Sequence, residues 1–348
     1  MLICFLSGCP ISFGLANIEW KKMEELEVTI CCLTYNHGPY LERTLAGFIE
    51  QVTDFKFEIL ICDDCSVDST LKIAQAFRNE HPDKIRILTT PTNQGPHINY
   101  KRSLESCTGK YIAYCEGDDY WTDPNKLQKQ VNFLKSNPDY FLCCHSSDVL
   151  FEDKIKEHGI KRPDAGRDTY DYIDLVEKGN FIGMLTIVYE RKLNDLIGEW
   201  HMKCPIGDYS FYLAVAMLTK KKIKFFEESM SMYRVHSRGR FSSESLAGRV
   251  KMIVSTLLVM KEGLPVEFSN DLESAIYNNF TPILNYHEEL ISTNEWLKTQ
   301  LKNHQAALEE KQSEIKKMLE SITLLESRVI SKKNLYLAIK NKFFRFKN

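Results

Sequence analysis

Five short, continuously apolar runs recur between Val28 and Ser146, and amphipathic stretches separate them. The runs read VTICCL, FEILIC, IRILTT, KYIAYC and YFLCCH. Strands that are apolar on both faces are typical of a parallel sheet that helices cover on both sides. The stretches between the runs, such as residues 41–49, space their apolar residues as amphipathic helices do. The alternation predicts an α/β domain with a mainly parallel sheet.

Charge and composition narrow the classes of protein to which the chain can belong. Its 348 residues carry 45 basic and 47 acidic side chains, which gives a formal net charge of −2. This balance argues against a nucleic-acid partner, because such binding depends on neutralising phosphates with Lys and Arg. No apolar run approaches the roughly 20 residues that a membrane-spanning helix needs. The 11 cysteines lie mostly within the strand-like runs, where reduced cysteine behaves as a small apolar side chain, so we expect a cytoplasmic protein.

The ends of the chain differ in composition from its middle. Residues 1–22 form an apolar N-terminal extension without the Lys or Arg that precedes the apolar part of a signal peptide, so Met23 is an alternative start. Residues 23–241 are expected to form the α/β domain and residues 242–290 a helical region.

Two further segments follow the helical region. An apolar residue recurs at every seventh position from Leu301 to Val329, which predicts a coiled coil over residues 291–330 and a homo-oligomer. A single long helix packed on its own domain is the alternative. Residues 331–348 form a basic, amphipathic, aromatic-rich tail that suits contact with the inner face of a membrane, and a solvated end is the other interpretation.

Polar and acidic side chains follow three of the predicted strands. The segments are TYNH after the first strand, DDCSVDS after the second and EGDDYW after the fourth. Ligands of such sheets bind outside the carboxyl ends of the strands. We therefore expect the three segments to form one site.

The acids of the third segment suggest a cation. Asp118 and Asp119 are adjacent at the end of a strand, where they repel each other unless a cation or solvent compensates. Mg2+ and Mn2+ bind one or two carboxylates together with the oxygens of a substrate phosphate. Asp123 has a different interpretation, because it precedes Pro124 and a helical pattern and is expected to be a helix N-cap, with the proline at the first helical position.

The acids of the second segment have two interpretations. Ser66 or Asp68 can cap the helix that follows, whereas Asp63 and Asp64 lie too early for capping. A carboxylate here can accept a hydrogen bond from the imide N–H of uracil or thymine, and Tyr35 can pack on the base.

Four stretches together resemble, in order and spacing, the glycosyltransferase family 2 enzymes with their GT-A fold. They are VTICCLTYNHGPYLERTL, EILICDDCSVDSTLKIA, NQGPHINYKRSLESCTGKYIAYCEGDDYWTDPNKLQKQ and CPIGDYSFYL with MYRVH, and the resemblance covers roughly Glu27 to Gly239. It implies a role for each matching residue. Tyr35 and Asp64 would hold the nucleobase of a nucleotide-sugar. Glu116 to Asp118 fall on the DXD motif, so Asp118 would be the metal ligand, with Asp119 in support. Asp208 would be the catalytic base, and His236 would lie near the metal or the diphosphate.

The sequence also departs from the family pattern. Glu116 replaces the first aspartate of DXD, and Cys65 stands where glycine is usual. Asn99, which we place at the cofactor site, begins an Asn-Tyr-Lys that replaces the usual Ala-Arg-Asn, so Lys101 or Arg102 would have to replace the missing arginine.

Some of these residues also have structural interpretations. Asp208 can be a helix N-cap, and His236 can be a surface histidine. For Trp121 and Tyr120 a place in the core is the expected one.

The expected function is that of a metal-dependent inverting glycosyltransferase that uses Mn2+ or Mg2+, a nucleotide-sugar donor and a glycan or lipid-linked acceptor in the synthesis of a surface polysaccharide or glycoconjugate. A sugar nucleotidyltransferase is the first alternative, but TYNHGPY is not the glycine-rich basic loop that it needs. The second alternative is a non-catalytic coiled-coil scaffold. It would not need Asp64, Asp118 and Asp208 together.

Overall fold

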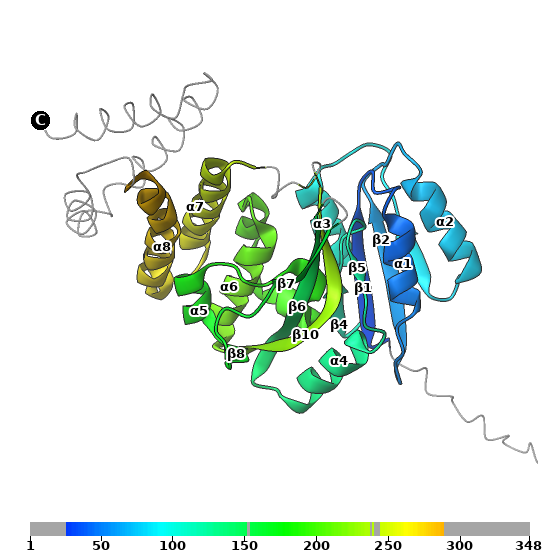
Figure 1. The fold of residues 1–348 in the computed structure, drawn as a ribbon, viewed down its shortest axis with the longest axis horizontal. Helices are drawn as coiled ribbons and strands as arrows, with labels where there is room; N and C mark the ends of the chain where they lie inside the picture. The colour runs from blue at the N-terminus through cyan, green and yellow to red at the C-terminus, as the bar shows by residue number, and fades with distance from the viewer. Residues whose placement is uncertain (1–25, 152–153, 237–238, 240–243, 289–348) are drawn as a thin grey trace, which may run out of the picture.

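The computed structural model describes residues 26–288 apart from 152–153, 237–238 and 240–243 (Figure 1). The expected N-terminal extension, the coiled coil over 291–330 and the tail over 331–348 lie outside the described residues. Among the residues that are described, no helix is long and apolar enough to cross a bilayer.

One twisted sheet forms the centre of the molecule. Its strands are β1 (Val28–Thr34), β2 (Phe57–Asp63), β3 (Ile85–Leu88), β4 (Tyr111–Tyr114), β5 (Tyr120–Trp121), β6 (Tyr140–Phe151), β7 (Lys154–Ile160), β8 (Thr169–Tyr170), β9 (Val188–Glu190) and β10 (Lys222–Val235). They lie in the order β3-β2-β1-β4-β9-β6-β10-β5, with β7 on β6 and β8 on β10. The pairs β1 with β2, β2 with β3, β1 with β4 and β6 with β10 are parallel. β9 runs antiparallel between β4 and β6.

Helices cover both faces of this sheet. They are α1 (Leu41–Ile49), α2 (Thr70–Glu80), α3 (Pro96–Ser106), α4 (Lys126–Ser136), α5 (Tyr172–Lys178), α6 (Gly207–Thr219), α7 (Leu246–Gly263) and α8 (Ser269–Glu288). Four short 3-10 helices, η1 (Met184–Thr186), η2 (Arg191–Leu196), η3 (Glu199–Lys203) and η4 (Val266–Phe268), complete the described part. Figure 1 shows α1 and α2 towards one end of the molecule and α5 to α8 towards the other.

The sheet separates two apolar clusters, which explains why its central strands are apolar on both faces. One cluster contains the inner faces of α1, α2 and α4 with Ile30 and Cys32 of β1. The other contains residues of α3, α5, α6, α7 and α8 with Cys31 of the same strand. Adjacent residues of β1 therefore enter opposite cores, as the period of a strand requires.

The five apolar runs do form the predicted strands β1, β2, β3, β4 and β6, and residues 41–49 form the predicted helix α1. The cysteines that the structure describes are free thiols, and all of them except Cys65 are buried.

The predicted helix caps needed correction. Asn125 and not Asp123 is the N-cap of α4, and Pro124 lies before the helix. The Asp123 carboxylate instead accepts the Asn125 N–H at 2.8 Å and pairs with Lys129 at 2.8 Å. The N-cap of α2 is Ser69, one residue after the predicted Asp68. In both places a short acidic side chain satisfies a backbone N–H two residues ahead of it, as Asx turns do.

Candidate active site

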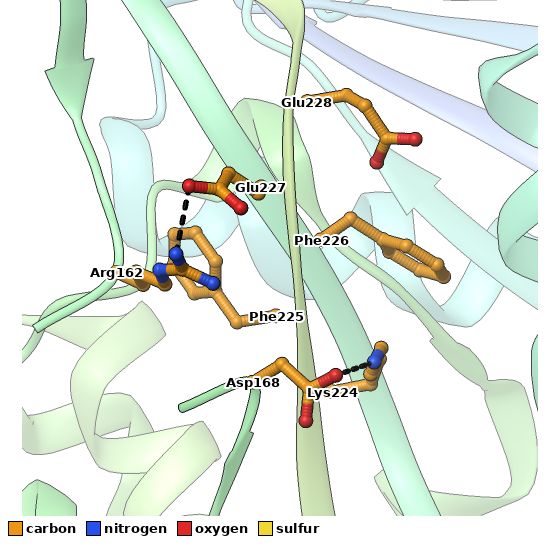
Figure 2. Close-up of a pocket in the computed structure, with 7 residues that line it drawn as sticks. All are labelled: Arg162, Asp168, Lys224, Phe225, Phe226, Glu227 and Glu228. Carbon is orange, nitrogen blue, oxygen red and sulfur yellow. Dashed lines mark hydrogen bonds and ion pairs between the residues drawn. The ribbon is translucent and has the colours of Figure 1, made fainter. Parts of the chain in front are cut away.

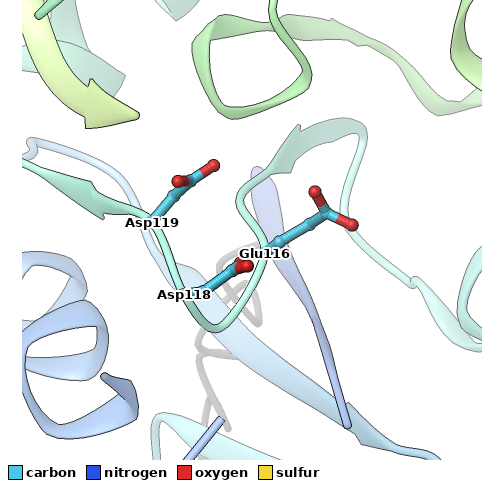
Figure 3. Close-up of side chains that lie close together, drawn as sticks. All are labelled: Glu116, Asp118 and Asp119. Carbon is cyan, nitrogen blue, oxygen red and sulfur yellow. The ribbon is translucent and has the colours of Figure 1, made fainter. Parts of the chain in front are cut away.

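Three carboxylates meet in the loop between β4 and β5. The ligand atoms of Glu116, Asp118 and Asp119 lie within 4.8 Å of one another. Figure 3 shows the three side chains projecting from this one tight loop. Thr44 of α1 holds the loop in place, because its hydroxyl donates to the Asp119 carbonyl at 2.6 Å and lies 3.0 Å from the Gly117 carbonyl.

Two histidines flank the Asp118 carboxylate. Its Oδ2 lies 2.9 Å from His236 Nε2 and 3.7 Å from His37 Nε2. Burial raises the pKa of Asp118, but the hydrogen bond from His236 and the charge of His37 outweigh burial and hold this pKa below its ordinary value. Asp118 is therefore ionised at neutral pH.

The other oxygen of Asp118 fits a cation. Oδ1 is buried and has no hydrogen-bond partner among the described residues. An unpaired anionic oxygen costs free energy when it is buried, unless a cation or water binds it. With Glu116 and Asp119 beside it, the donor set consists of hard carboxylate oxygens, which Mg2+ and Mn2+ prefer.

Asp119 supports this arrangement from behind. It is 3 % exposed, and its Oδ1 accepts the backbone N–H of Arg234 at 2.8 Å. Burial and the charge of Asp118 raise the pKa of Asp119 well above its ordinary value. The Arg234 guanidinium in turn donates from Nε to the Asp118 carbonyl at 2.9 Å. These contacts fix the end of β10, and with it His236, against the acidic loop.

His37 is a residue that the sequence analysis did not single out. It belongs to the TYNH segment that follows β1, so its place after a strand was the available signal. A Cβ on Gly117 would lie only 2.9 Å from both His37 Nδ1 and Thr34 Oγ1, so the acidic loop approaches β1 as closely as glycine permits.

The residues expected at the nucleobase follow β1 and β2. Tyr35 is 44 % exposed, so its ring is open to a partner. Asp64 is 3 % exposed, and its oxygens accept the backbone N–H groups of Gln94 and Gly95, each at 2.8 Å. A carboxylate has further lone pairs, so Asp64 can still accept a hydrogen bond from a base. Its contacts also hold the loop between β3 and α3.

The side chain of Asn99 forms hydrogen bonds within the protein. Its Nδ2 donates to the Cys62 carbonyl at 3.0 Å, and its Oδ1 accepts from Arg102 at 2.6 Å. Arg102 also donates to the Asp63 carbonyl at 2.9 Å, and Lys101 pairs with Glu199 at 3.2 Å. The amide of Asn99 thus joins α3 to the end of β2, and its expected cofactor contact stays a prediction. Neither Lys101 nor Arg102 is positioned as a free replacement for the missing arginine.

Asp208 lies in the first turn of α6. The N-cap of this helix is Ile206, so the capping interpretation of Asp208 is wrong. Its Oδ1 accepts the Tyr209 N–H at 2.8 Å, and its Oδ2 accepts from Asn180 at 3.2 Å. Burial raises the pKa of Asp208 above its ordinary value, because these hydrogen bonds only partly offset the loss of solvent.

Asp208 and the acidic loop lie in one electrostatic neighbourhood. All four carboxylates influence the pKa of Tyr233, near the end of β10. Burial and the charges of Asp119, Glu116, Asp118 and Asp208 raise the pKa of this tyrosine. The acidic loop follows the carboxyl end of β4, where ligands of such sheets bind, and Asp208 lies close enough to influence the same tyrosine.

Trp121 lies in the core, as expected. It is 1 % exposed, its Nε1 donates to the Leu185 carbonyl at 3.0 Å, and its ring contacts Phe48 edge to face.

One cavity lies away from these residues. It measures about 620 Å3 and is lined by the first half of β10 together with Arg162 and Asp168. Figure 2 shows that four of its charged groups form two pairs, Arg162 with Glu227 and Lys224 with Asp168. Because Arg234 lies at the other end of the same strand and His236 follows that end, this cavity is not part of the acidic site.

Comparisons with known proteins show what the chain is similar to. A family model described as glycosyl transferase family 2 matches residues 29–213. An uncharacterized protein of Mycobacterium tuberculosis is 34 % identical over 218 residues, which are 62 % of this chain and 61 % of that protein. The chain thus matches less than two thirds of this relative. The poly(ribitol-phosphate) beta-N-acetylglucosaminyltransferase TarS of Staphylococcus aureus is 29 % identical over 138 residues, 39 % of this chain and 22 % of that protein.

Solved structures show the same fold. Residues 1–349 of S. aureus TarS in complex with UDP align with a TM-score of 0.56 and 16 % identity over 78 % of this chain and 77 % of that chain. The mannosyltransferase PcManGT of Pyrobaculum calidifontis, in complex with GDP-Man and Mn2+, aligns with a TM-score of 0.54 and 18 % identity over 82 % and 81 %. These likenesses confirm the expected GT-A fold. Because the family model matches more than half of the chain, the protein belongs to glycosyltransferase family 2.

Proposed function

We propose that the protein is a metal-dependent, inverting glycosyltransferase that moves a sugar from a nucleoside-diphosphate sugar to a hydroxyl group of a glycan or lipid-linked acceptor. The observation that carries the proposal is the convergence of Glu116, Asp118 and Asp119 at one strand end, with Asp208 in the same neighbourhood. UDP in the TarS structure, and GDP-Man with Mn2+ in PcManGT, support this choice of donor and cofactor.

Glu116 and Asp118 would hold a Mn2+ or Mg2+ ion, with Asp119 and His236 as supporting groups. The free Oδ1 of Asp118 is the strongest indication of a ligand atom. Negative charge develops on the departing nucleoside diphosphate, and a bound divalent cation stabilises such charge. His37, which shares the Asp118 oxygen with His236, would help to orient this carboxylate.

Asp208 would take the proton of the attacking hydroxyl. A raised pKa makes a carboxylate a better base, because the strongest general bases have a pKa close to the working pH. A base that approaches the anomeric carbon from the side opposite the diphosphate allows a single displacement, which inverts the configuration.

Tyr35 would pack on the nucleobase, and Asp64 would accept its imide N–H. The exposed ring of Tyr35 supports the first contact, and the further lone pairs of Asp64 permit the second.

We place the reaction in the synthesis of a surface polysaccharide or glycoconjugate, at the cytoplasmic side of a membrane. The TarS relative, whose name specifies a poly(ribitol-phosphate) substrate, supports this assignment.

The test separates donor binding from sugar transfer. Calorimetry with UDP-, GDP-, dTDP- and CDP-sugars should detect binding of at least one donor in the presence of Mn2+ and weaker binding after EDTA is added. Asp118→Asn should remove the dependence on Mn2+, whereas Asp208→Asn should bind the donor normally and lose transfer by a factor of roughly 100 or more. Asp123→Asn is the matched control, because Asp123 lies in the same stretch but pairs with Lys129.

Two results would contradict the proposal. Donor binding by Asp118→Asn that depends on Mn2+ as strongly as in the parent would remove the metal assignment. A folded parent protein that binds none of the four donors would favour the non-catalytic scaffold instead.

A further inference from the structure

Tyr212 of α6 carries a buried hydroxyl group without a partner. The residue is 1 % exposed, and its Oη has no hydrogen-bond partner among the described residues. Tyr212 follows Asp208 by four positions on the same helix, so the two side chains lie on one face of α6.

The surroundings of this hydroxyl belong to the site. Burial and the charge of Asp208 raise the pKa of Tyr212, with a smaller contribution from Glu116, so its phenol stays protonated and can act as a donor. Asp208 is the proposed base, and Glu116 belongs to the acidic loop after β4. The phenol therefore lies within electrostatic range of both sides of the site.

Other buried tyrosines of the same core have partners for their hydroxyls. Tyr189 donates to Asn194 Oδ1 at 3.1 Å, and Tyr209 donates to the Leu175 carbonyl at 2.9 Å. The Tyr114 hydroxyl lies 3.1 Å from Ser103 Oγ. The unpaired state is thus particular to Tyr212 in this group and does not reflect a general shortage of acceptors in the core.

A buried hydroxyl without a partner lowers the stability of the fold, because it loses its hydrogen bonds to water and gains none in the protein. Phenylalanine fills nearly the same volume without this penalty, and the neighbouring Phe211 shows that the core accepts such a ring. A destabilising polar group beside a proposed base is typical of a group whose partner is the substrate.

We propose that the Tyr212 hydroxyl donates a hydrogen bond to the oxygen that attacks the sugar, and so orients this oxygen together with Asp208. The inference rests on the proposed transfer reaction. The attacking O–H gives its proton to the Asp208 carboxylate, and its oxygen forms the new bond to the anomeric carbon. The bond from that carbon to the diphosphate breaks, and its electron pair leaves on the nucleoside diphosphate. Of the two lone pairs on the attacking oxygen, one forms the new bond and the other accepts from Tyr212.

The experiment uses the full chain, with water as the attacking group, so that the natural acceptor need not be known. Release of nucleoside diphosphate is measured with Mn2+ and whichever UDP-, GDP-, dTDP- or CDP-sugar stabilises the parent most against heat. Tyr212→Phe should lower kcat roughly tenfold, as expected for one lost hydrogen bond, and leave the KM for the donor unchanged. Its Tm should be equal to or higher than that of the parent.

Tyr189→Phe is the matched control, because it removes a hydroxyl that already has a partner within the protein. It should lower Tm and leave kcat unchanged. Unchanged kcat in Tyr212→Phe, or a fall in its Tm like that of the control, would overturn the inference and leave the proposed function intact. A folded parent that releases no nucleotide from any donor would overturn the proposed function, and the inference with it.

Discussion

At the scale of single residues, Lys126 is unusual because it is a lysine with a fully buried side chain. Its side chain is 0 % exposed, its ammonium lies 4.0 Å from the centre of the Trp121 ring, and Gln130 Oε1 accepts from it at 2.8 Å. Burial lowers the pKa of Lys126 to about 7, which the nearby Cys115 and Cys143 only partly offset. One neutral acceptor and one ring face replace a full shell of water, so burying the charged form of Lys126 costs free energy.

Replacing Lys126 should therefore stabilise the protein in a pH-dependent way. An unfolded lysine has a pKa of about 10.4, so between about pH 7 and pH 10 the unfolded chain binds more protons, and the free energy of unfolding rises with pH. Below about pH 7 the whole cost of burying the charge is present. Lys126→Met should gain on the order of a few kcal/mol there, and this gain should vanish towards pH 10.

Urea denaturation of both proteins between pH 6 and pH 10 measures this difference. Lys129→Met is the control, because Lys129 forms a half-exposed pair with Asp123, and its loss should change stability by only about 0.5 kcal/mol. A gain for Lys126→Met that does not depend on pH would show that the ammonium is not the source of the effect.

At the scale of elements, the loop after β4 depends on its contact with the end of β1. The N–H of Gly117 donates to the Leu33 carbonyl at 2.9 Å, which continues the pairing of β1 with β4 into the loop. Any side chain on Gly117 would meet Thr34 and His37 at 2.9 Å. The position of the acidic loop is thus set by backbone contact, and its carboxylates are carried along with the backbone.

Gly117→Ala should separate this loop from β1. We expect a loss of about 1–3 kcal/mol in the free energy of unfolding, as for other overpacked sites, and weaker Mn2+-dependent binding of the nucleotide-sugar. Gly207→Ala is a control for stability alone, since a Cβ there would meet nothing closer than His201 Nε2 at 4.0 Å. Denaturant titration and calorimetry measure the two effects, and binding that survives unchanged in Gly117→Ala would contradict the close packing of the loop.

Element boundaries show where local patterns succeed and fail. Apolar runs predicted the strands, because a strand buried on both faces leaves its pattern in consecutive residues. The caps were misplaced, because Asp, Ser and Asn bind backbone N–H groups equally well from turns one or two residues ahead of a helix.

At the scale of the whole molecule, the described helices α7 and α8 pack against α5, α6 and η3 in the same apolar cluster as the sheet. The seven-residue repeat from Leu301 to Val329 lies beyond them in the sequence. It remains a prediction of self-association.

Sedimentation of the full chain and of a variant ending at residue 290 tests this prediction. The full chain should self-associate and the shortened chain should be a monomer, because apolar seams at this spacing are buried between helices. Leu308→Glu combined with Ile315→Glu should dissociate the full chain without removing its basic tail. A full chain that sediments as a monomer would favour the alternative of one helix packed on its own domain.

The α/β architecture, the family and the acidic strand ends could be predicted from the sequence, because each of them depends on consecutive residues or on motifs of fixed order. Tertiary structure alone decided which of these residues meet. His236 reaches Asp118 across 118 positions of sequence, and Asp208 comes from a separate helix to the same neighbourhood. The structure also showed that the Asn99 amide has hydrogen-bond partners within the protein, whereas the Tyr212 hydroxyl has none among the described residues. Such partners depend on the neighbours of each group in space. Composition and spacing do not show which residues become neighbours in space, so the contact of His37 with Asp118 and the unpaired hydroxyl of Tyr212 could be seen only in the fold.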